Sequence, residues 1–309
     1  NSNSISQEGC SPGNYQPDTG QTSCIDANPG NFVTDHNSII QTACNLGTYH
    51  NITGSTQESD CQSSDPGHYV DSFGASSQTE CPAGSYNPNT GSLSSSDCLF
   101  ADSGHFVADS GSPAQTPCDL GYYQPFSGQL FCLESASGSY VSEIGSSSVT
   151  YCTEGNYQPE SSQSECIDAD EGFYVQTPRS SSQTPCLAGS YQSETGTTSC
   201  ILADIGYHVP LDGQSMQTIC PAGQYQPQPA SSECLTTDPG SYSSVGSTSP
   251  SPCLAGSYQE QAGQSGCALA DPGYFVSSVA STEQIACSEG KYQSLTGQES
   301  CLSADRGHY

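Results

Sequence analysis

The residues of this chain that could do chemistry are its cysteines, aspartates and histidines, and their spacing limits what that chemistry can be. Eighteen cysteines are spread along 309 residues, and neighbouring cysteines are never closer than 14 positions. Zinc and iron–sulfur sites use cysteines two to four residues apart, so this spacing argues against metal–thiolate chemistry. An even number of regularly spaced cysteines instead favours disulfides, and therefore an extracellular or other oxidising location.

An aspartate recurs two residues before a glycine in most repeats, and it has two explanations. These residues are Asp65, Asp102, Asp170, Asp204, Asp238, Asp271 and Asp305, with Asn28 in the same position. Oxygen ligands at fixed intervals on an anionic chain make them weak calcium candidates. The alternative is turn chemistry, in which the carboxylate accepts hydrogen bonds over a tight turn. One carboxylate per repeat is too few for a closed calcium site, so we favour the turn and expect no cofactor.

The histidines offer neither an active site nor a metal centre. They are His36, His50, His68, His105, His208 and His308. No Ser-His-Asp or Cys-His set can be assembled from them, because the cysteines are structural and the histidines occupy positions that vary between repeats. We therefore expect no enzymatic activity. Asn51-Ile52-Thr53 is an Asn-x-Thr sequon at an expected turn, which makes Asn51 a candidate for N-glycosylation, and the frequent Ser and Thr would permit O-glycosylation.

The charge of the chain is one-sided. Asp and Glu number 32 against three cations, Arg179, Lys291 and Arg306, which gives a net charge of -29. Nucleic acid is excluded as a partner because phosphate binding needs a basic surface, and anionic membranes are disfavoured for the same reason. Only 32% of residues are hydrophobic and Trp is absent, so the core must be thin and stabilised by disulfides. No apolar run is long enough to span a membrane, and no signal peptide is present.

The cysteines define a repeat. Their separations alternate between a short gap of 14 residues (twice 17) and a long gap of 20 (once 19), so the unit is about 34 residues long. We predict one continuous array with units at 10–43, 44–80, 81–117, 118–151, 152–185, 186–219, 220–252, 253–286 and 287–309. Residues 1–9 are the tail of a preceding unit, and the last unit is truncated.

Each unit contains two half-repeats of about 17 residues, marked by the triplet Gly-x-aromatic. The aromatics are Tyr15, Phe32, Tyr49, Tyr69, Tyr86, Phe106, Tyr123, Tyr140, Tyr157, Tyr174, Tyr191, Tyr225, Tyr242, Tyr258, Phe275, Tyr292 and Tyr309, with His208 in the one remaining position. We expect short strands and turns, no helix, and the aromatic ring as the core element. The predicted fold is an elongated all-β, partly irregular, disulfide-rich array of eighteen half-repeats.

The arrangement of the half-repeats has two alternatives that the sequence does not separate. They could stack as the rungs of a solenoid, or follow one another as strung modules. The chain begins and ends at nearly the same phase of the repeat. This is expected either of a window from a longer repetitive protein or of subunits that meet head to tail.

The cysteine ladder allows two pairings, across the short gap or across the long one. The long-gap scheme leaves Cys10 and Cys301 unpaired within the chain, whereas the short-gap scheme pairs all eighteen. The motif Cys-x2-Gly-x-Tyr-x8-Cys resembles the cysteine-rich repeats of tumour necrosis factor receptors and the ephrin-receptor-like repeats. In those families the opening cysteine pairs with the cysteine about fourteen residues later, and a second disulfide follows.

This chain lacks both cysteines of that second disulfide. Three residues after the short gap stand Ala27, Ser64, Ala101, Ser135, Ala169, Ala203, Thr237, Ala270 and Ala304; three residues before the opening cysteines stand Gln7, Gln41, Gln78, Gln115, Val149, Gln183, Gln217, Pro250 and Gln284. The resemblance therefore implies the short-gap disulfides Cys10–Cys24, Cys44–Cys61, Cys81–Cys98, Cys118–Cys132, Cys152–Cys166, Cys186–Cys200, Cys220–Cys234, Cys253–Cys267 and Cys287–Cys301. It also leaves the second half-repeats to be held by packing alone.

Repetition without a distinguished unit predicts a secreted structural protein at the cell surface, either a rod-like stalk or the subunit of an extracellular fibre. Its expected partners are other copies of itself or the surface that carries it. The alternative, which the resemblance allows, is a ligand-binding receptor-like or adhesin ectodomain for a protein or glycan. That alternative requires a distinctive exposed patch, for which the wider units between Cys44 and Cys118 are the candidates.

Overall fold

The computed structural model describes residues 7–307, and a short two-stranded hairpin recurs throughout them. The predicted features at His308 and Tyr309, and residues 1–6 of the predicted tail, lie outside the described residues. The chain divides into two compact units: the first runs to Thr150 and includes Ser161–Glu165, and the second comprises Tyr151–Glu160 and the residues from Cys166 onward. The nine boundaries expected from the cysteine spacing stay a prediction.

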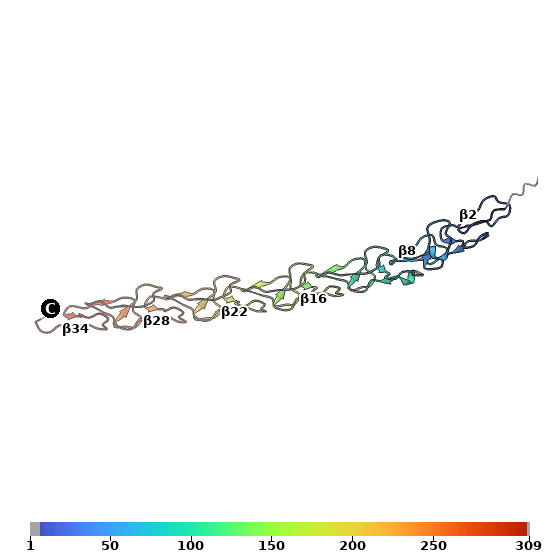
Figure 1. Cartoon of the computed structure of the whole chain (residues 1–309). Coiled ribbons are helices and arrows are strands. Elements are labelled where there is room, and N and C mark those ends of the chain that lie inside the picture. The colour runs from blue at the N-terminus through green and yellow to red at the C-terminus, as the bar shows by residue number, and fades with distance from the viewer. Residues whose placement is uncertain (1–6, 308–309) are drawn as a thin grey trace, which may run out of the picture. The chain divides into compact units, whose positions relative to one another are not determined.

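Among the described residues, seventeen half-repeats each supply one hairpin, whose first strand is the x-aromatic dipeptide (Figure 1). In the first half-repeats the antiparallel pairs are β1 (Asn14–Tyr15) with β2 (Ile25–Asp26), β5 (Thr48–Tyr49) with β6 (Gln62–Ser63), β9 (Ser85–Tyr86) with β10 (Leu99–Phe100), β13 (Tyr122–Tyr123) with β14 (Leu133–Glu134), β17 (Asn156–Tyr157) with β18 (Ile167–Asp168), β21 (Ser190–Tyr191) with β22 (Ile201–Leu202), β25 (Gln224–Tyr225) with β26 (Leu235–Thr236), β29 (Ser257–Tyr258) with β30 (Ala268–Leu269), and β33 (Lys291–Tyr292) with β34 (Leu302–Ser303).

In the second half-repeats the pairs are β3 (Asn31–Phe32) with β4 (Thr42–Ala43), β7 (His68–Tyr69) with β8 (Thr79–Glu80), β11 (His105–Phe106) with β12 (Thr116–Pro117), β19 (Phe173–Tyr174) with β20 (Thr184–Pro185), β23 (Tyr207–His208) with β24 (Thr218–Ile219), β27 (Ser241–Tyr242) with β28 (Ser251–Pro252), and β31 (Tyr274–Phe275) with β32 (Ile285–Ala286). The strands β15 (Ser139–Tyr140) and β16 (Thr150–Tyr151) occupy the corresponding places in the fourth repeat.

The two wider first half-repeats contain the helical turns of the described chain. The 3-10 turns η1 (Glu58–Asp60) and η2 (Ser95–Asp97) stand in the short gaps of 17 residues, and no α-helix occurs among residues 7–307. The prediction of an all-β, disulfide-rich repeat array is confirmed. The turns arise because three additional residues must be accommodated between two cysteines whose Cα atoms stay 5.7–5.8 Å apart, as they do in every loop.

Successive half-repeats within a unit are joined by main-chain hydrogen bonds. The Gly84 N–H donates to the carbonyl of Val107 in the next half-repeat at 2.9 Å, and the Val107 N–H donates to Gln129 in the one after at 3.0 Å. The Gly128 N–H reaches back to the carbonyl of Ala101 at 2.8 Å. Each half-repeat therefore bonds to its neighbour and also lies against the half-repeat beyond it. Within each unit this is stacking, so the half-repeats are not independent strung modules.

A glycine is required where a half-repeat contacts the half-repeat two positions later in the chain. Gly84 has φ +86°, and a Cβ added there would lie 2.5 Å from the carbonyl oxygen of Gly128. Any side chain at this position would force two backbones apart. The same close approach recurs along the array, with a turn carbonyl facing the glycine of the triplet. This tight contact is what the glycine of Gly-x-aromatic provides.

The core is made of small residues, and the expectation that aromatic rings form it was wrong. The most buried side chains are opening cysteines, the small residue three positions after each short gap, and the valine that follows the aromatic in second half-repeats. Ala203, Val209 and Cys220 are fully buried, whereas the rings are mostly half-buried and Tyr292 is exposed. Most rings are therefore only partly covered, and Phe32 is the one ring of the repeat triplets that is buried among the described residues.

Candidate functional site

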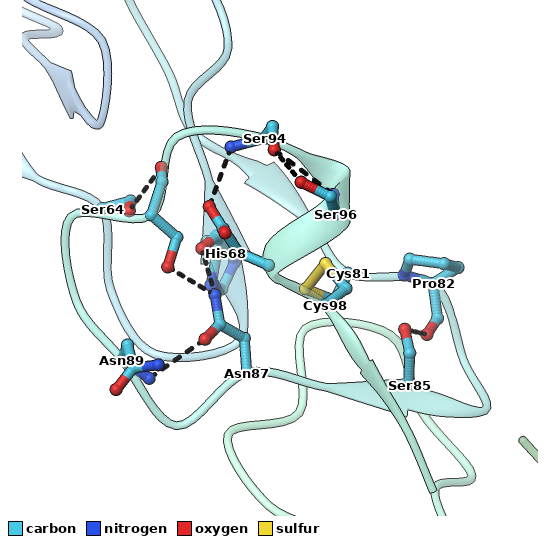
Figure 2. Close-up of a disulfide and its surroundings, with 12 residues drawn as sticks. Ser64, His68, Cys81, Pro82, Ser85, Asn87, Asn89, Ser94, Ser96 and Cys98 are labelled. Carbon is cyan, nitrogen blue, oxygen red and sulfur yellow. Dashed lines mark hydrogen bonds between the residues drawn. A yellow bond between two sulfur atoms is a disulfide. The ribbon is translucent and has the colours of Figure 1, made fainter.

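Nine disulfides close the short gaps, and they are the most regular feature of the molecule. They join Cys10–Cys24, Cys44–Cys61, Cys81–Cys98, Cys118–Cys132, Cys152–Cys166, Cys186–Cys200, Cys220–Cys234, Cys253–Cys267 and Cys287–Cys301, and no cysteine is free. Figure 2 shows Cys81–Cys98 beside the η2 turn. The opening cysteine is buried in nearly every loop and its partner is half-buried, so each bridge anchors a surface loop to the core.

A buried amide holds the turn of each narrow loop. The Gln192 side chain is only 5% exposed; its Nε2 donates to the Ser199 carbonyl at 2.8 Å and its Oε1 accepts the Glu194 N–H at 3.1 Å. Equivalent bonds are made by Gln16, Gln124, Gln226, Gln259 and Gln293. This explains the Tyr-Gln dipeptide of first half-repeats, a role that sequence reasoning missed although the recurrence of Gln was visible.

In the two wider loops a different residue stands at the position of that glutamine. Asn87 donates through Nδ2 to Ser92 Oγ at 2.7 Å and accepts the Asn89 N–H at 3.1 Å, as Figure 2 shows in part. In the other wide loop His50 takes the position, and its buried Nδ1 has no hydrogen-bond partner. The adjacent sequon residue Asn51 is exposed, so its amide is accessible, and glycosylation there stays a prediction.

The recurring aspartates are paired with the glutamines that stand where the related families have a cysteine. In each pair the Gln Oε1 accepts the Asp N–H and the Gln Nε2 donates to Asp Oδ2, at 2.6–2.8 Å. The pairs are Asp65–Gln78, Asp102–Gln115, Asp170–Gln183, Asp204–Gln217 and Asp271–Gln284, and Gln41 accepts the Asn28 N–H. These side chains close the second half-repeats, which packing alone was expected to hold.

The calcium candidates are exposed carboxylates on separate half-repeats. Asp238 faces no such glutamine because Pro250 takes its place, and the Asp305 side chain is also exposed. Within residues 7–307 one group of three potential ligand residues comes within metal-binding range, namely His208, Cys220 and Cys234. Cys220 and Cys234 are disulfide-bonded there and offer no thiolate. The structure therefore gathers no aspartates into one site, and calcium binding stays a prediction.

The histidines are dispersed. His68 Nδ1 lies 3.1 Å from the Pro66 carbonyl, and His105 Nδ1 lies 3.4 Å from the Ser103 carbonyl. His36 is exposed. Each of these three histidines lies in or next to a turn of its own half-repeat. Among the described histidines, His208 is the one whose ring contacts a sulfur atom, with Nδ1 3.1 Å from Cys234 Sγ.

One charged group has a shifted pKa. The carboxylate of Asp60 accepts the Thr56 N–H at 2.9 Å and the Gln57 N–H at 3.2 Å, over the start of η1. The hydrogen bond from Thr56 is the main reason that the pKa of Asp60 lies below its usual value, and the bonds from Gln57 and the charge of His50 act in the same direction. The carboxylate thus stabilises the additional turn of this wide loop.

Exposed phenylalanines gather in the first compact unit. Phe100, Phe126 and Phe131 are 62–72% exposed. The Phe100 ring lies against Gly128, in the same loop as the other two, and the Gln124 amide bonds to the backbone of both Phe126 and Phe131. This patch lies partly within and partly beyond the stretch from Cys44 to Cys118 that was the candidate for a binding surface. Sequence reasoning missed it because loop width, rather than phenylalanine content, was the criterion.

A family model described as tyrosine-protein kinase ephrin type A/B receptor-like matches residues 104–152. The match confirms the resemblance to ephrin-receptor-like cysteine-rich repeats, over a stretch that includes the Cys118–Cys132 loop. No curated protein matches the chain. Together with the nine disulfides, the match indicates a receptor-like extracellular module. The described residues contain no helix with the length and apolarity needed to cross a bilayer.

Proposed function

We propose that the chain is a secreted structural protein, serving as a rod-like stalk or as the subunit of an extracellular fibre. The observation that supports this is the main-chain ladder within each unit, in which Gly84 bonds to Val107 and Val107 to Gln129. These links join backbone to backbone, so they depend on the repeat and not on one special side chain. An array of this kind grows in length with every repeat added, because each repeat contacts only its neighbours.

We propose further that copies join head to tail. The donors and acceptors of one half-repeat match those of any other, so the ladder between residues can continue between molecules. The net charge of -29 opposes side-by-side contact at low ionic strength and favours single filaments over bundles.

Electron microscopy and solution scattering of the 309-residue chain test this proposal. Elongated particles are expected, and their length should rise with protein concentration as copies join. Deleting residues 186–219 keeps the phase of the cysteines and should shorten the particle by one repeat. Compact, globular monomers would contradict the proposal. Adding a chelator to the same samples tests calcium binding. If the recurring aspartates bind calcium, its removal should change particle length or thermal stability.

The proposed location also predicts glycosylation. Asn51 is exposed at a turn, which suits a glycan on a secreted protein. Expression in a eukaryotic secretory pathway should yield a product whose mass falls on treatment with peptide N-glycosidase. Asn51→Gln should abolish that mass change, while Asn89→Gln, outside any sequon, should leave it intact.

A second candidate is a receptor-like or adhesin ectodomain for a protein or glycan ligand. Phe100, Phe126 and Phe131 favour it, since all three are exposed, Phe100 lies against the loop that carries the other two, and exposed apolar surface marks interaction sites. The family match covers Phe126 and Phe131. Replacing the three phenylalanines with serine should abolish binding to a glycan array or to intact cells. Leu187→Ser with Leu254→Ser, at exposed positions of the second compact unit, is the matched control. Equal binding by both variants would exclude the patch.

A further inference from the structure

The imidazole of His208 lies against a disulfide. Its Nδ1 is 3.1 Å from Cys234 Sγ and 3.1 Å from the carbonyl oxygen of Thr218. A carbonyl oxygen only accepts hydrogen bonds, so the Thr218 contact places the ring proton on Nδ1. That N–H is then shared between Thr218 and the sulfur of Cys234. Both sulfurs of the Cys220–Cys234 bridge lie within 4.8 Å of the ring nitrogen.

Among the described repeats, only one has an imidazole against its disulfide. In other repeats an aromatic side chain lies near the disulfide at the same position. Tyr174 and Cys200 line one shallow surface hollow, and Phe275 and Cys301 line another at the same position of a later repeat. His208 occupies the same position in the repeat as Tyr174 and Phe275. His208 differs from these two residues because its ring carries an N–H that donates a hydrogen bond to the bridge.

We infer that Cys220–Cys234 is a thiol–disulfide exchange site whose substrate is a neutral or cationic thiol. Cys220 is fully buried and Cys234 is half-buried, so an incoming thiolate reaches Cys234 Sγ. A bond forms between the incoming sulfur and Cys234 while the Cys234–Cys220 bond breaks, and its electron pair leaves on Cys220 as a thiolate that then takes a proton. A second thiol releases Cys234 and departs as the oxidised disulfide, completing a two-electron reduction of the bridge.

His208 accelerates the first step by stabilising charge. The Nδ1–H draws electron density from Cys234 Sγ, the sulfur that is attacked, and the ring stays within 4.8 Å of the Cys220 sulfur, on which the leaving electron pair develops. A donor worth one charge-assisted hydrogen bond speeds the reaction about tenfold. The preference among thiols follows from the net charge of -29, and Glu233 immediately before Cys234 adds a local negative charge.

Limited exchange with cysteamine under native conditions tests this on the whole chain. Free thiols are trapped by alkylation at timed intervals, and peptide mapping then gives the opening rate of each bridge. Cys220–Cys234 should open about tenfold faster than Cys186–Cys200, with cysteamine found on Cys234. Mercaptoethanesulfonate, an anionic thiol, should react more slowly than cysteamine. Cys10–Cys24 is left out of the comparison because Cys24 is exposed.

Two variants exchange the rings between repeats. His208→Tyr installs the ring of the preceding repeat and should slow Cys220–Cys234 to the rate of Cys186–Cys200. Tyr174→His should make Cys186–Cys200 about tenfold faster. Each variant uses a ring that this position already carries elsewhere in the chain, and unchanged hydrogen exchange in the other repeats verifies folding. Equal rates at both bridges in the natural chain, or a His208→Tyr bridge that opens as fast as before, would overturn the inference.

Discussion

Gln217 holds Asp204 at two atoms: its Oε1 accepts the Asp204 N–H at 2.7 Å, and its Nε2 donates to Asp204 Oδ2 at 2.8 Å. Gln217 stands three residues before Cys220, where the related receptor repeats have a cysteine, and Asp204 follows Ala203, the other such position. A pair of hydrogen bonds therefore closes the second half-repeat where those families use a covalent bond. This pairing, which we call the Asp–Gln clasp, is indifferent to reducing conditions.

Removing the clasp should loosen one half-repeat without unfolding the array. Gln217→Ala frees the Asp204 N–H, so that amide should exchange with solvent about fivefold faster, as expected for a net loss of about 1 kcal/mol. Hydrogen exchange followed by mass spectrometry measures this. Asp204→Ala should release the Gln217 side chain, and the double variant should cost less than the sum of the two single ones. Asp238→Ala, where Pro250 replaces the glutamine, is the control and should change nothing.

The buried glutamine of a narrow loop should contribute more to the stability of the folded chain than an exposed glutamine does. Gln192→Leu keeps the volume but deprives the Ser199 carbonyl and the Glu194 N–H of their partner, at a cost of about 1–3 kcal/mol. The urea midpoint, followed by tyrosine fluorescence because the chain lacks Trp, should fall. Gln261→Leu alters an exposed side chain in the equivalent loop of a later repeat and should leave the midpoint unchanged. An equal effect of both substitutions would contradict the proposed role of the buried amide.

Two glycines with similar backbone angles should respond differently to alanine. Gly84 (φ +86°) faces the Gly128 carbonyl, whereas Gly20 (φ +77°) has no atom within 4 Å of an added Cβ. Gly20→Ala should cost about 1 kcal/mol for the left-handed conformation alone. Gly84→Ala should add a backbone collision, lower the thermal midpoint further, and expose the Gly128 amide to exchange. If both variants lost the same stability, the close approach would be unimportant.

The sequence predicted the repeat but not which side chains form its buried core. The strands at Gly-x-aromatic follow from local patterning, which the sequence shows directly. The identity of the core does not, because it depends on how closely two backbones approach. Where Gly84 allows the Gly128 carbonyl to approach, the small side chain of Ala101 is fully buried and the ring of Tyr86 is only half-buried.

The Asp–Gln clasp could have been found from the sequence by comparing the repeats. In the fourth repeat both positions change together, to Ala136 and Val149, whereas in the seventh Asp238 stays and Pro250 replaces the glutamine. Such paired change indicates contact, whereas each aspartate taken alone indicates only a turn. The contact of His208, by contrast, could not be predicted by comparing the repeats. Its position was visible as an exception among the aromatics, but its contact with Cys234 depends on how one repeat lies on the next.

The wide loop at η1 should respond to acid. Hydrogen bonding by the Thr56 N–H, above all, lowers the pKa of Asp60 below its usual value of 3.8. A carboxylate whose pKa is lower in the folded state stabilises that state above the unfolded pKa, and this contribution is lost as the pH falls through the folded pKa. The Thr56 amide should therefore stay protected at about pH 5 and lose protection as the pH falls below about 4. Amide chemical shifts in NMR measure it. Asp60→Asn should remove the transition, and Asp35→Asn in the preceding half-repeat should retain it. A transition that survives in Asp60→Asn would assign the acid response to another group.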